Sequence, residues 1–284
     1  MSDREASRTA LATAYLRAAH QFLDASPLIL EDPVALRLLG ADAAKRIEES
    51  IERYRTPEGA ALRSHVVLRS RFAEDRLAAA VRRGVTQYIV LGAGFDTFAL
   101  RQPDWAKALR IIEVDHPGTQ ALKRSKLAEA GLEMPANATF AQVDFEHESL
   151  QEGLLRQGVA LQQPSFFSWL GVTMYLQEAA ISAALRSMAA FAPGSEVVLT
   201  FLQPQASAAD AARQAHSRLA AHVAGIGEPF LSRFEPPALE ALLRGAGFAR
   251  VEFLSPQEAA ALYYTGRPTD LPPPRHTSIA CAIR

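Results

Sequence analysis

The pattern with the clearest chemical meaning in this 284-residue chain is a short apolar run that ends in two glycines and an acid. After the apolar residues 88–91 come Gly92, Ala93, Gly94, Phe95, Asp96 and Thr97. Glycines after a strand let the backbone turn tightly and approach a ligand closely, and Asp96 or Thr97 can cap a following helix. The pattern predicts a nucleotide-type ligand cradle, and a plain strand–turn–helix without a ligand is the alternative.

The acid in this loop distinguishes between two kinds of ligand. In the dinucleotide fingerprint G-x-G-x-x-G, a pyrophosphate lies on a helix N-terminus and the third glycine permits close helix packing. Here Thr97 occupies the third glycine position, and the Asp96 carboxylate would repel a pyrophosphate. A ligand with an ammonium and a sulfonium group would instead be attracted to a carboxylate. The loop therefore favours S-adenosylmethionine over a nicotinamide dinucleotide.

Two further acids follow the next apolar run. Glu113 and Asp115 lie 21 and 23 residues after Gly92. An acid about 20 residues beyond such a loop binds ribose hydroxyls in open α/β cofactor sites. Because side chains alternate along a strand, the two acids share a face, and Asp115 at the carboxyl end reaches the crevice. The alternative is a helix N-cap, formed by Asp115 or His116 before Pro117.

The third and fourth apolar runs also end in residues that suit a ligand. Asp144 and Phe145 supply a hydrogen-bond acceptor and a flat apolar wall, which an adenine ring needs, although Asp144 can equally be a solvated turn residue. The fourth run passes into a bend at Gly171, which would lie at the carboxyl edge of the sheet. Thr173 or Tyr175 could therefore face the group that is transferred.

These side chains require a sheet to position them. Alternation of strand-like and helical segments from residue 86 to about residue 200 predicts an α/β fold with a parallel, doubly wound sheet. The last two strands, joined by a long irregular segment, could add an antiparallel edge. The seven predicted strands cover residues 86–91, 110–114, 139–143, 166–170, 196–202, 249–254 and 278–283.

Helical patterns precede and interrupt these strands. Before residue 86 the chain is predicted to be helical, most clearly over 62–83, and further helices are predicted over 207–223 and 236–247. Added helices of this kind commonly form a lid. We expect a single domain over 1–284, with a helical N-terminal cap at 1–84 and a cofactor-binding core at 85–284 that carries inserted helices at about 204–247.

The composition excludes several classes of function. Thirty basic and thirty-one acidic residues give a net charge of −1, so no electrostatic footprint for nucleic acid is expected. No apolar stretch reaches the roughly 18 residues of a membrane span, and the N-terminus lacks a signal sequence, so a cytoplasmic protein is predicted. The spacing of the seven histidines and the single cysteine predicts no metal site.

Taken in order, these motifs resemble those of the leucine carboxyl methyltransferase family, and most closely its bacterial branch of small-molecule methyltransferases, which includes polyketide O-methyltransferases. The resemblance covers nearly the whole chain. It rests on residues 91–97, 113–117, 143–145 and 167–176, with further similarity over 26–33, 69–75 and 255–267.

The family implies a class I, Rossmann-like S-adenosylmethionine fold. Its sheet has seven mostly parallel strands and an antiparallel last strand, entered between strands six and seven. The resemblance implies that Arg69, or the nearby Arg71, binds the methionine carboxylate of the cofactor. It also maps the ribose-binding acid to Asp115 and the adenine contacts to Asp144 and Phe145.

One position departs from the family pattern. Many members carry a glutamate just before Gly171, and this chain has Leu170, so the contact that this acid supplies must be absent or replaced. The predicted cofactor-binding residues are Arg69, Arg71, Gly92, Ala93, Gly94, Asp96, Thr97, Glu113, Asp115, His116, Asp144, Phe145, Leu170 and Gly171.

The leading hypothesis is O-methylation of a small molecule at a carboxylate or a phenol. Methyl transfer from a sulfonium is an in-line displacement, in which a carboxylate needs no general base and a phenol benefits from one. Arg17 and Arg267 could hold an acidic substrate. The predicted catalytic residues are Tyr175, Arg267, Tyr264 and His20, with Tyr263 as a further candidate base.

Three alternatives remain open from the sequence. The first is methylation of a protein C-terminal carboxylate, which is the reaction of the family's eukaryotic members. The second is an NAD(P)-dependent oxidoreductase, which Asp96 and the missing third glycine disfavour. The third is a non-catalytic scaffold that keeps the cofactor fold. The sequence determines neither the oligomeric state nor whether oxygen, nitrogen or carbon is methylated.

Overall fold

The computed structural model describes residues 7–143, 148–204, 217, 219–221, 223–268 and 270–284. Two predicted adenine contacts, Asp144 and Phe145, lie outside the described residues. Most of the helix predicted over 207–223 lies outside them as well.

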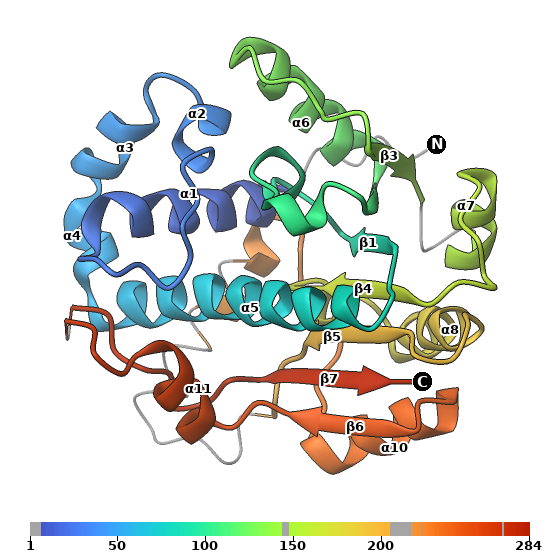
Figure 1. Ribbon diagram of the computed structural model, residues 1–284. Coiled ribbons are helices and arrows are strands. Elements are labelled where there is room, and N and C mark those ends of the chain that lie inside the picture. The colour runs from blue at the N-terminus through green and yellow to red at the C-terminus, as the bar shows by residue number, and fades with distance from the viewer. Residues whose placement is uncertain (1–6, 144–147, 205–216, 218, 222, 269) are drawn as a thin grey trace.

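The seven predicted strands form one sheet in the order β3-β2-β1-β4-β5-β7-β6, so their number and places in the chain are confirmed (Figure 1). The pairs from β3 to β5 are parallel, and β7 is antiparallel to both of its neighbours. The strands are β1 (Gln87–Leu91), β2 (Arg110–Asp115), β3 (Ala138–Gln142), β4 (Ser165–Trp169), β5 (Glu196–Thr200), β6 (Arg250–Phe253) and β7 (Ile279–Ile283).

The position of β7 corrects one expectation. The resemblance places the entry of the last strand between strands six and seven. In the structure β7 is instead inserted between β5 and β6, and β6 forms the edge of the sheet. The residues explain this order, because β7 is apolar and almost entirely buried, while β6 exposes Arg250 and Glu252. Charged side chains suit an edge strand because they discourage pairing with another chain.

Alternation along the central strands gives the sheet two buried faces. Tyr88 and Val90 of β1 belong to the core on one face, together with Leu68 of α5 (Pro57–Arg82). Ile89 and Leu91 belong to the core on the other face, which α7 (Leu150–Arg156), α8 (Glu178–Ala189) and α10 (Pro236–Ala246) help to form. Successive side chains of each strand point to opposite faces, and both faces of the sheet are buried, as is usual for a parallel sheet.

The helical cap predicted before the first strand is present. The helix predicted over 62–83 begins earlier, as α5 at Pro57, because the Thr56 hydroxyl accepts the Gly59 N–H at 3.0 Å and proline suits the first helical position. Helix α1 packs against α5 (Figure 1). The other cap helices are α1 (Arg8–Leu23), α2 (Ala35–Leu39), α3 (Ala43–Glu49) and α4 (Ile51–Arg55).

Two connections differ from the prediction. The helix expected after the glycine loop is only a 3₁₀ turn, η1 (Phe98–Leu100), followed by a second, η2 (Asp104–Ala106). The segment between β6 and β7, predicted to be irregular, contains α11 (Pro256–Tyr263), which begins at a capping box formed by Ser255 and Glu258. A capping box satisfies two backbone donors at once, which makes so short a helix favourable. Between β2 and β3 lies α6 (Pro117–Glu129).

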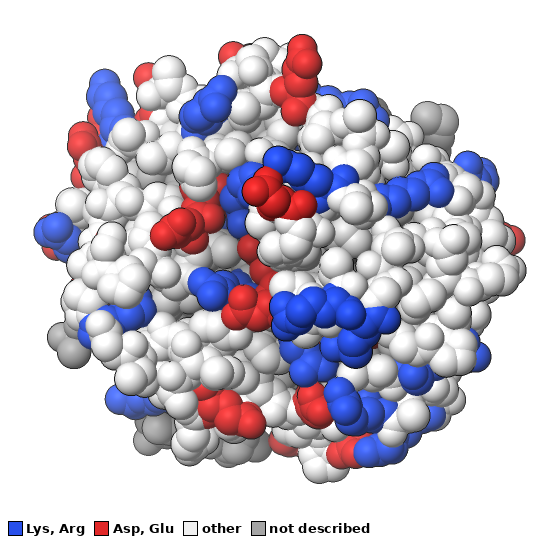
Figure 2. Space-filling view, viewed as in Figure 1, with Lys and Arg blue, Asp and Glu red and all other residues white. Residues whose placement is uncertain are grey.

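Charged residues of both signs are intermingled on the face seen in Figure 2. Ion pairs also join α5 and its end to the sheet, since Arg76 lies 2.6 Å from the buried Glu196 and 3.3 Å from Glu252, and Arg83 also pairs with Glu196. In the parts of the chain that the structure describes, no helix is long and apolar enough to cross a membrane.

Candidate functional site

A cavity of about 970 Å³ lies where the carboxyl ends of β1, β2 and β4 meet the helical cap. Ligands bind at this edge of open α/β sheets. Its walls come from α1, α5, the glycine loop, the turn after β4 and the segment from Val223 to Leu231. Sheet and cap therefore share one site.

The glycine loop forms the floor of the cavity. Gly92 and Gly94 have φ angles of +63° and +50°, which L side chains rarely adopt. A Cβ atom at Gly92 would overlap the side chain of Val172, and one at Gly94 would lie 3.1 Å from the Cβ of Ala10. Glycine is thus required here by backbone conformation and by the closeness of the cap.

Asp115 closes one side of this floor. Its Oδ2 accepts the Gly94 N–H at 2.5 Å, and its Oδ1 accepts the His116 N–H at 2.7 Å. Burial raises the pKa of the Asp115 carboxyl, and the two backbone hydrogen bonds oppose that rise. His116 also lines the cavity, while its Nδ1 accepts the Gly118 N–H at 3.2 Å and caps α6. His116 is therefore both the N-cap of α6 and part of the cavity wall.

Two predicted cofactor contacts do not line the cavity. The Glu113 carboxylate forms a buried ion pair with Lys123, whose Nζ also donates to the Asp96 carbonyl at 2.6 Å. Thr97 is buried, and its hydroxyl donates to Asp32 Oδ2 at 2.6 Å. The Glu113–Lys123 pair and the Thr97–Asp32 hydrogen bond therefore hold the glycine loop in place without facing the cavity. Asp96 itself lines the cavity, and its Oδ1 accepts the Phe98 N–H at 2.8 Å.

Arg69 is a cation that lines the cavity from α5. Within the described residues, no hydrogen bond or ion pair joins its guanidinium to another side chain. A Cβ atom at Gly171 would lie 2.7 Å from Nη1, so the guanidinium rests against that glycine. Burial lowers the pKa of Arg69 to about 10, so it remains charged at neutral pH. Arg71 is instead exposed, and its Nε donates to Asp75 Oδ1 at 3.0 Å.

His65 lines the cavity one helical turn before Arg69, and sequence reasoning did not select it. Its imidazole forms no hydrogen bond with any residue in the described part of the chain. Burial away from bulk solvent, and secondarily the charge of Arg69, lower the pKa of His65 to about 3. The imidazole is therefore neutral at physiological pH. The available signal was the spacing of four residues, which puts both side chains on one face of a helix.

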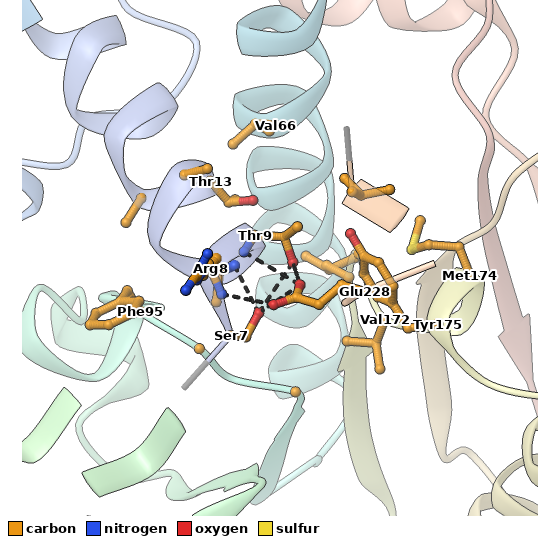
Figure 3. A pocket seen from close by; sticks show the side chains of 18 of the residues that line it. Ser7, Arg8, Thr9, Thr13, Val66, Phe95, Val172, Met174, Tyr175 and Glu228 are labelled. Atoms are coloured by element: carbon orange, nitrogen blue, oxygen red, sulfur yellow. Dashed lines mark hydrogen bonds between the residues drawn. The ribbon is translucent and has the colours of Figure 1, made fainter. Parts of the chain in front are cut away.

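The segment after residue 222 is held over the cavity by Glu228. Its Oε1 accepts the Arg8 N–H at 2.8 Å, and its Oε2 accepts hydrogen bonds from the hydroxyls of Ser7, at 3.2 Å, and Thr9. Figure 3 shows Glu228 between the start of α1 and Tyr175. A carboxylate is stabilised at a helix N-terminus by the free backbone N–H groups and the helix dipole. No motif in the sequence indicates this contact.

The turn after β4 forms the opposite wall. The turn η3 (Thr173–Tyr175) is joined to the same segment, because Leu231 N–H donates to the Met174 carbonyl at 2.7 Å. Tyr175 faces the cavity, and its ring centroid lies 5.5 Å from that of Phe230. Burial raises the pKa of the Tyr175 phenol, which therefore stays protonated at neutral pH. Leu170 and Gly171 line the cavity beside this turn.

The structure does not bring three of the predicted catalytic residues to the cavity. His20 Nδ1 lies 2.7 Å from Asp24 Oδ2, and both side chains are nearly inaccessible to solvent. The hydroxyl of Tyr264 is 2.5 Å from that of Ser64. Arg267 donates to backbone carbonyls of the loop that follows α1. Each of the three makes structural contacts and none lines the cavity, so we do not assign them to the substrate. Tyr263 does not line the cavity either.

The polar groups that line the cavity fit a ligand with a carboxylate and a ribose. Arg69 supplies an uncommitted cation, Asp115 supplies a carboxylate at the end of β2, and the glycine loop allows close approach of a ligand to the backbone. Asp96 adds a second carboxylate that suits a cationic group.

Comparison with known proteins identifies the family. The profile of the leucine carboxyl methyltransferase family matches residues 10–189. The Bacillus subtilis (strain 168) protein YktD, whose name describes an S-adenosyl-L-methionine-dependent methyltransferase, is 29% identical over 292 residues, 95% of each chain. A Mycobacterium avium (strain 104) protein with the same description is 30% identical over 211 residues, which cover 72% of this chain and 70% of that protein.

A solved structure supports the fold independently. A Thermobifida fusca YX protein described as a methyltransferase has a TM-score of 0.56 and 18% identity, covering 87% of this chain and 91% of that one. With these relatives, neither an oxidoreductase nor a scaffold accounts for the chain. It belongs to the leucine carboxyl methyltransferase family and is an S-adenosylmethionine-dependent methyltransferase with a class I, Rossmann-like fold.

Proposed function

We propose that the enzyme methylates an oxygen atom of a small molecule. The observation that carries the proposal is the cavity itself. Its volume of about 970 Å³ is near the upper end of the range of about 300–1,000 Å³ for small-molecule sites. Such a volume suits a cofactor together with a small acceptor, and the cap helices and the segment held by Glu228 form its roof.

Within this cavity we assign the cofactor to the glycine loop. Arg69 binds the methionine carboxylate by charge-assisted hydrogen bonds, and Asp115 accepts hydrogen bonds from the ribose hydroxyls. Asp96 lies on the side of the cationic groups. When bound, S-adenosylmethionine supplies an electrophilic methyl group. The residues of this chain align the acceptor with that group and exclude water from it.

The remaining walls suit a flat acceptor. Aromatic side chains line the cavity from four segments: Tyr15 from α1, Tyr54 from α4, Tyr175 from η3 and Phe230 from the segment held by Glu228. Arg17 also lines it, but its Nε lies 2.9 Å from Asp32 Oδ2, so its charge is already compensated. These surroundings favour an aromatic acceptor over a highly charged one.

We also propose that residues 1–284 form a single domain. The support is that α5 of the cap belongs to the same core as the sheet, since Leu68 and Leu77 share one hydrophobic cluster with Val90. Because both parts line one cavity, loss of the cap would remove half of the site.

A screen for acceptors tests the proposed function. The protein is incubated with S-adenosylmethionine and, in separate reactions, phenols, small carboxylic acids or a peptide that ends in leucine, and S-adenosylhomocysteine formation is measured. We expect turnover of a small oxygen acceptor at least about tenfold above that of the peptide, since the roofed cavity restricts access. Alkaline hydrolysis of the product distinguishes a methyl ester from an aryl methyl ether.

The Asp115→Ala variant is the matched control for this screen, and should reduce turnover of every acceptor alike because it weakens cofactor binding. Turnover restricted to the peptide would instead make the enzyme a protein carboxyl methyltransferase. A product methylated on nitrogen would contradict the assignment to oxygen.

A further inference from the structure

The side chains that α5 directs into the cavity follow one face of the helix. Leu62, His65, Val66 and Arg69 all line the cavity, at spacings of three and four residues. Helix α5 runs antiparallel to β1, with its N-terminal half beyond the carboxyl edge of the sheet (Figure 1). Moving from Arg69 to His65 therefore leads about 6 Å away from the sheet, towards the cap. If Arg69 holds the cofactor, His65 lies on the acceptor side.

Other ionisable groups in the wall are engaged, lack an acceptor atom or, like Asp96, are assigned above to the cofactor. Glu228 binds the N-terminus of α1, and Asp115 accepts two backbone N–H groups. His116 Nδ1 accepts the Gly118 N–H, so its Nε2 carries the proton and can only donate. The ionisable residues that line the cavity are Arg8, Tyr15, Arg17, Arg53, Tyr54, His65, Arg69, Asp96, Asp115, His116, Tyr175 and Glu228.

Tyr54 and Tyr175 cannot act as a general base in their protonated form. Burial raises the pKa of Tyr54 and of Tyr175, so both phenols remain protonated. Arg53 and Arg69 are cations without an acceptor atom. Of the described lining residues, His65 is the neutral ionisable group whose acceptor nitrogen no other residue occupies.

We propose that His65 binds the hydroxyl group of the acceptor and takes its proton during methyl transfer. The acceptor is then an aromatic hydroxyl compound that enters the cavity in its neutral form, and not a carboxylate. This inference rests on the proposed small-molecule O-methylation and names its substrate class.

The step is balanced without a further reactant. The hydroxyl donates a hydrogen bond to the free imidazole nitrogen of His65, and an oxygen lone pair points at the methyl carbon. The oxygen–carbon bond forms as the carbon–sulfur bond breaks, and the electron pair of that bond stays on sulfur. The proton passes to His65 and leaves to solvent after product release. A weakly basic imidazole suffices, because the oxygen becomes a very strong acid as it acquires the methyl group.

The test compares acceptors of graded acidity on wild type, His65→Gln and His65→Asn. With phenols that are un-ionised at the assay pH, we expect kcat/KM to fall about 100-fold or more in the variants, because general-base catalysis contributes about 10²–10⁴-fold. With phenols that are already ionised, the loss should be less than about tenfold. In the variants, turnover of an un-ionised phenol should rise about tenfold per pH unit, whereas wild type should vary little between about pH 6 and pH 8.

The matched control is His276→Gln, since His276 is exposed and does not line the cavity. Titration with S-adenosylhomocysteine shows which His65 variant keeps the cofactor site. Rates are compared with those of wild type for a variant whose affinity for S-adenosylhomocysteine is within about twofold of the wild-type affinity. A purely structural role for His65 would lower the rates of ionised and un-ionised acceptors alike, and would overturn the inference.

The same assay separates the inference from the proposed function. If wild type methylates small carboxylates but no hydroxyl compound, the inference fails while small-molecule O-methylation stands. If wild type methylates only the peptide, both fail. Equal kcat/KM of wild type and both variants on un-ionised phenols overturns the role of His65 alone.

Discussion

Arg69 and Arg71 lie two residues apart on α5, and this spacing decides which of them can meet a ligand. Two residues correspond to about 200° around a helix, so the side chains point to opposite sides. Arg69 faces the cavity against Gly171, and Arg71 pairs with Asp75 at the surface. The sequence nominated both arginines, and only the packing of α5 against the sheet separates them.

Replacement of each arginine by glutamine gives a matched pair of variants. Arg69→Gln should weaken S-adenosylhomocysteine binding about 10- to 100-fold, because a charge-assisted hydrogen bond to a carboxylate contributes about 1.5–3 kcal/mol. Arg71→Gln should leave the affinity within about twofold of wild type. Isothermal titration calorimetry measures both dissociation constants. Equal losses in the two variants, or no loss in Arg69→Gln, would remove the cofactor carboxylate from Arg69.

The predicted catalytic residues that do not line the cavity share one physical cause. His20 and Arg267 have the chemistry of catalytic residues, but a sequence does not show that His20 pairs with Asp24 or that Arg267 binds nearby carbonyl groups. His65 and Glu228 were missed for the complementary reason. Their roles depend on which side of a helix or loop faces the cavity, and on contacts about 220 residues apart in the chain.

At the scale of elements, the strands were predictable because each is a short run rich in apolar residues. Asp96 lies in the loop after β1 and Asp115 is the last residue of β2, and the parallel sheet brings both to one edge. The order of the last two strands was missed, although part of its signal is local. The charges of Arg250 and Glu252 suit an edge strand, whereas the pairing of β7 with β5 is a tertiary contact that only the structure shows.

Gly171 tests how closely α5 and the turn after β4 must approach. Gly171 and Gly266 share a φ of +76°, but a Cβ at Gly266 meets no atom within 4 Å, whereas one at Gly171 would press on the Arg69 guanidinium. Both alanine variants should lose about 1–2 kcal/mol of stability from the left-handed backbone. Only Gly171→Ala should also weaken S-adenosylhomocysteine binding, by about tenfold or more.

Thermal unfolding and calorimetric titration separate the two effects. Similar falls in Tm, with the loss of affinity confined to Gly171→Ala, would support the arrangement. A loss of affinity of the same size in Gly266→Ala would show that general destabilisation, and not the contact with Arg69, is responsible.

At the scale of the whole molecule, the cap and the sheet act on one cavity from opposite sides. The sheet contributes the glycine loop and Asp115, and the cap contributes Arg69 and His65 through α5. Glu228 then ties the segment over the cavity to the start of α1. Since roof and floor come from segments far apart in the chain, the acceptor space could not be outlined from the sequence, although the cofactor edge could.

We assign S-adenosylmethionine to this cavity, with Asp115 on its ribose. The decisive measurement is calorimetric titration of wild type and Asp115→Ala with S-adenosylhomocysteine. We predict that wild type binds, and that the variant binds about 10- to 100-fold more weakly while its fold is retained, because the ribose hydroxyls lose a charged hydrogen-bond acceptor. An Asp115→Ala variant with the affinity of wild type would show that Asp115 does not bind the ribose.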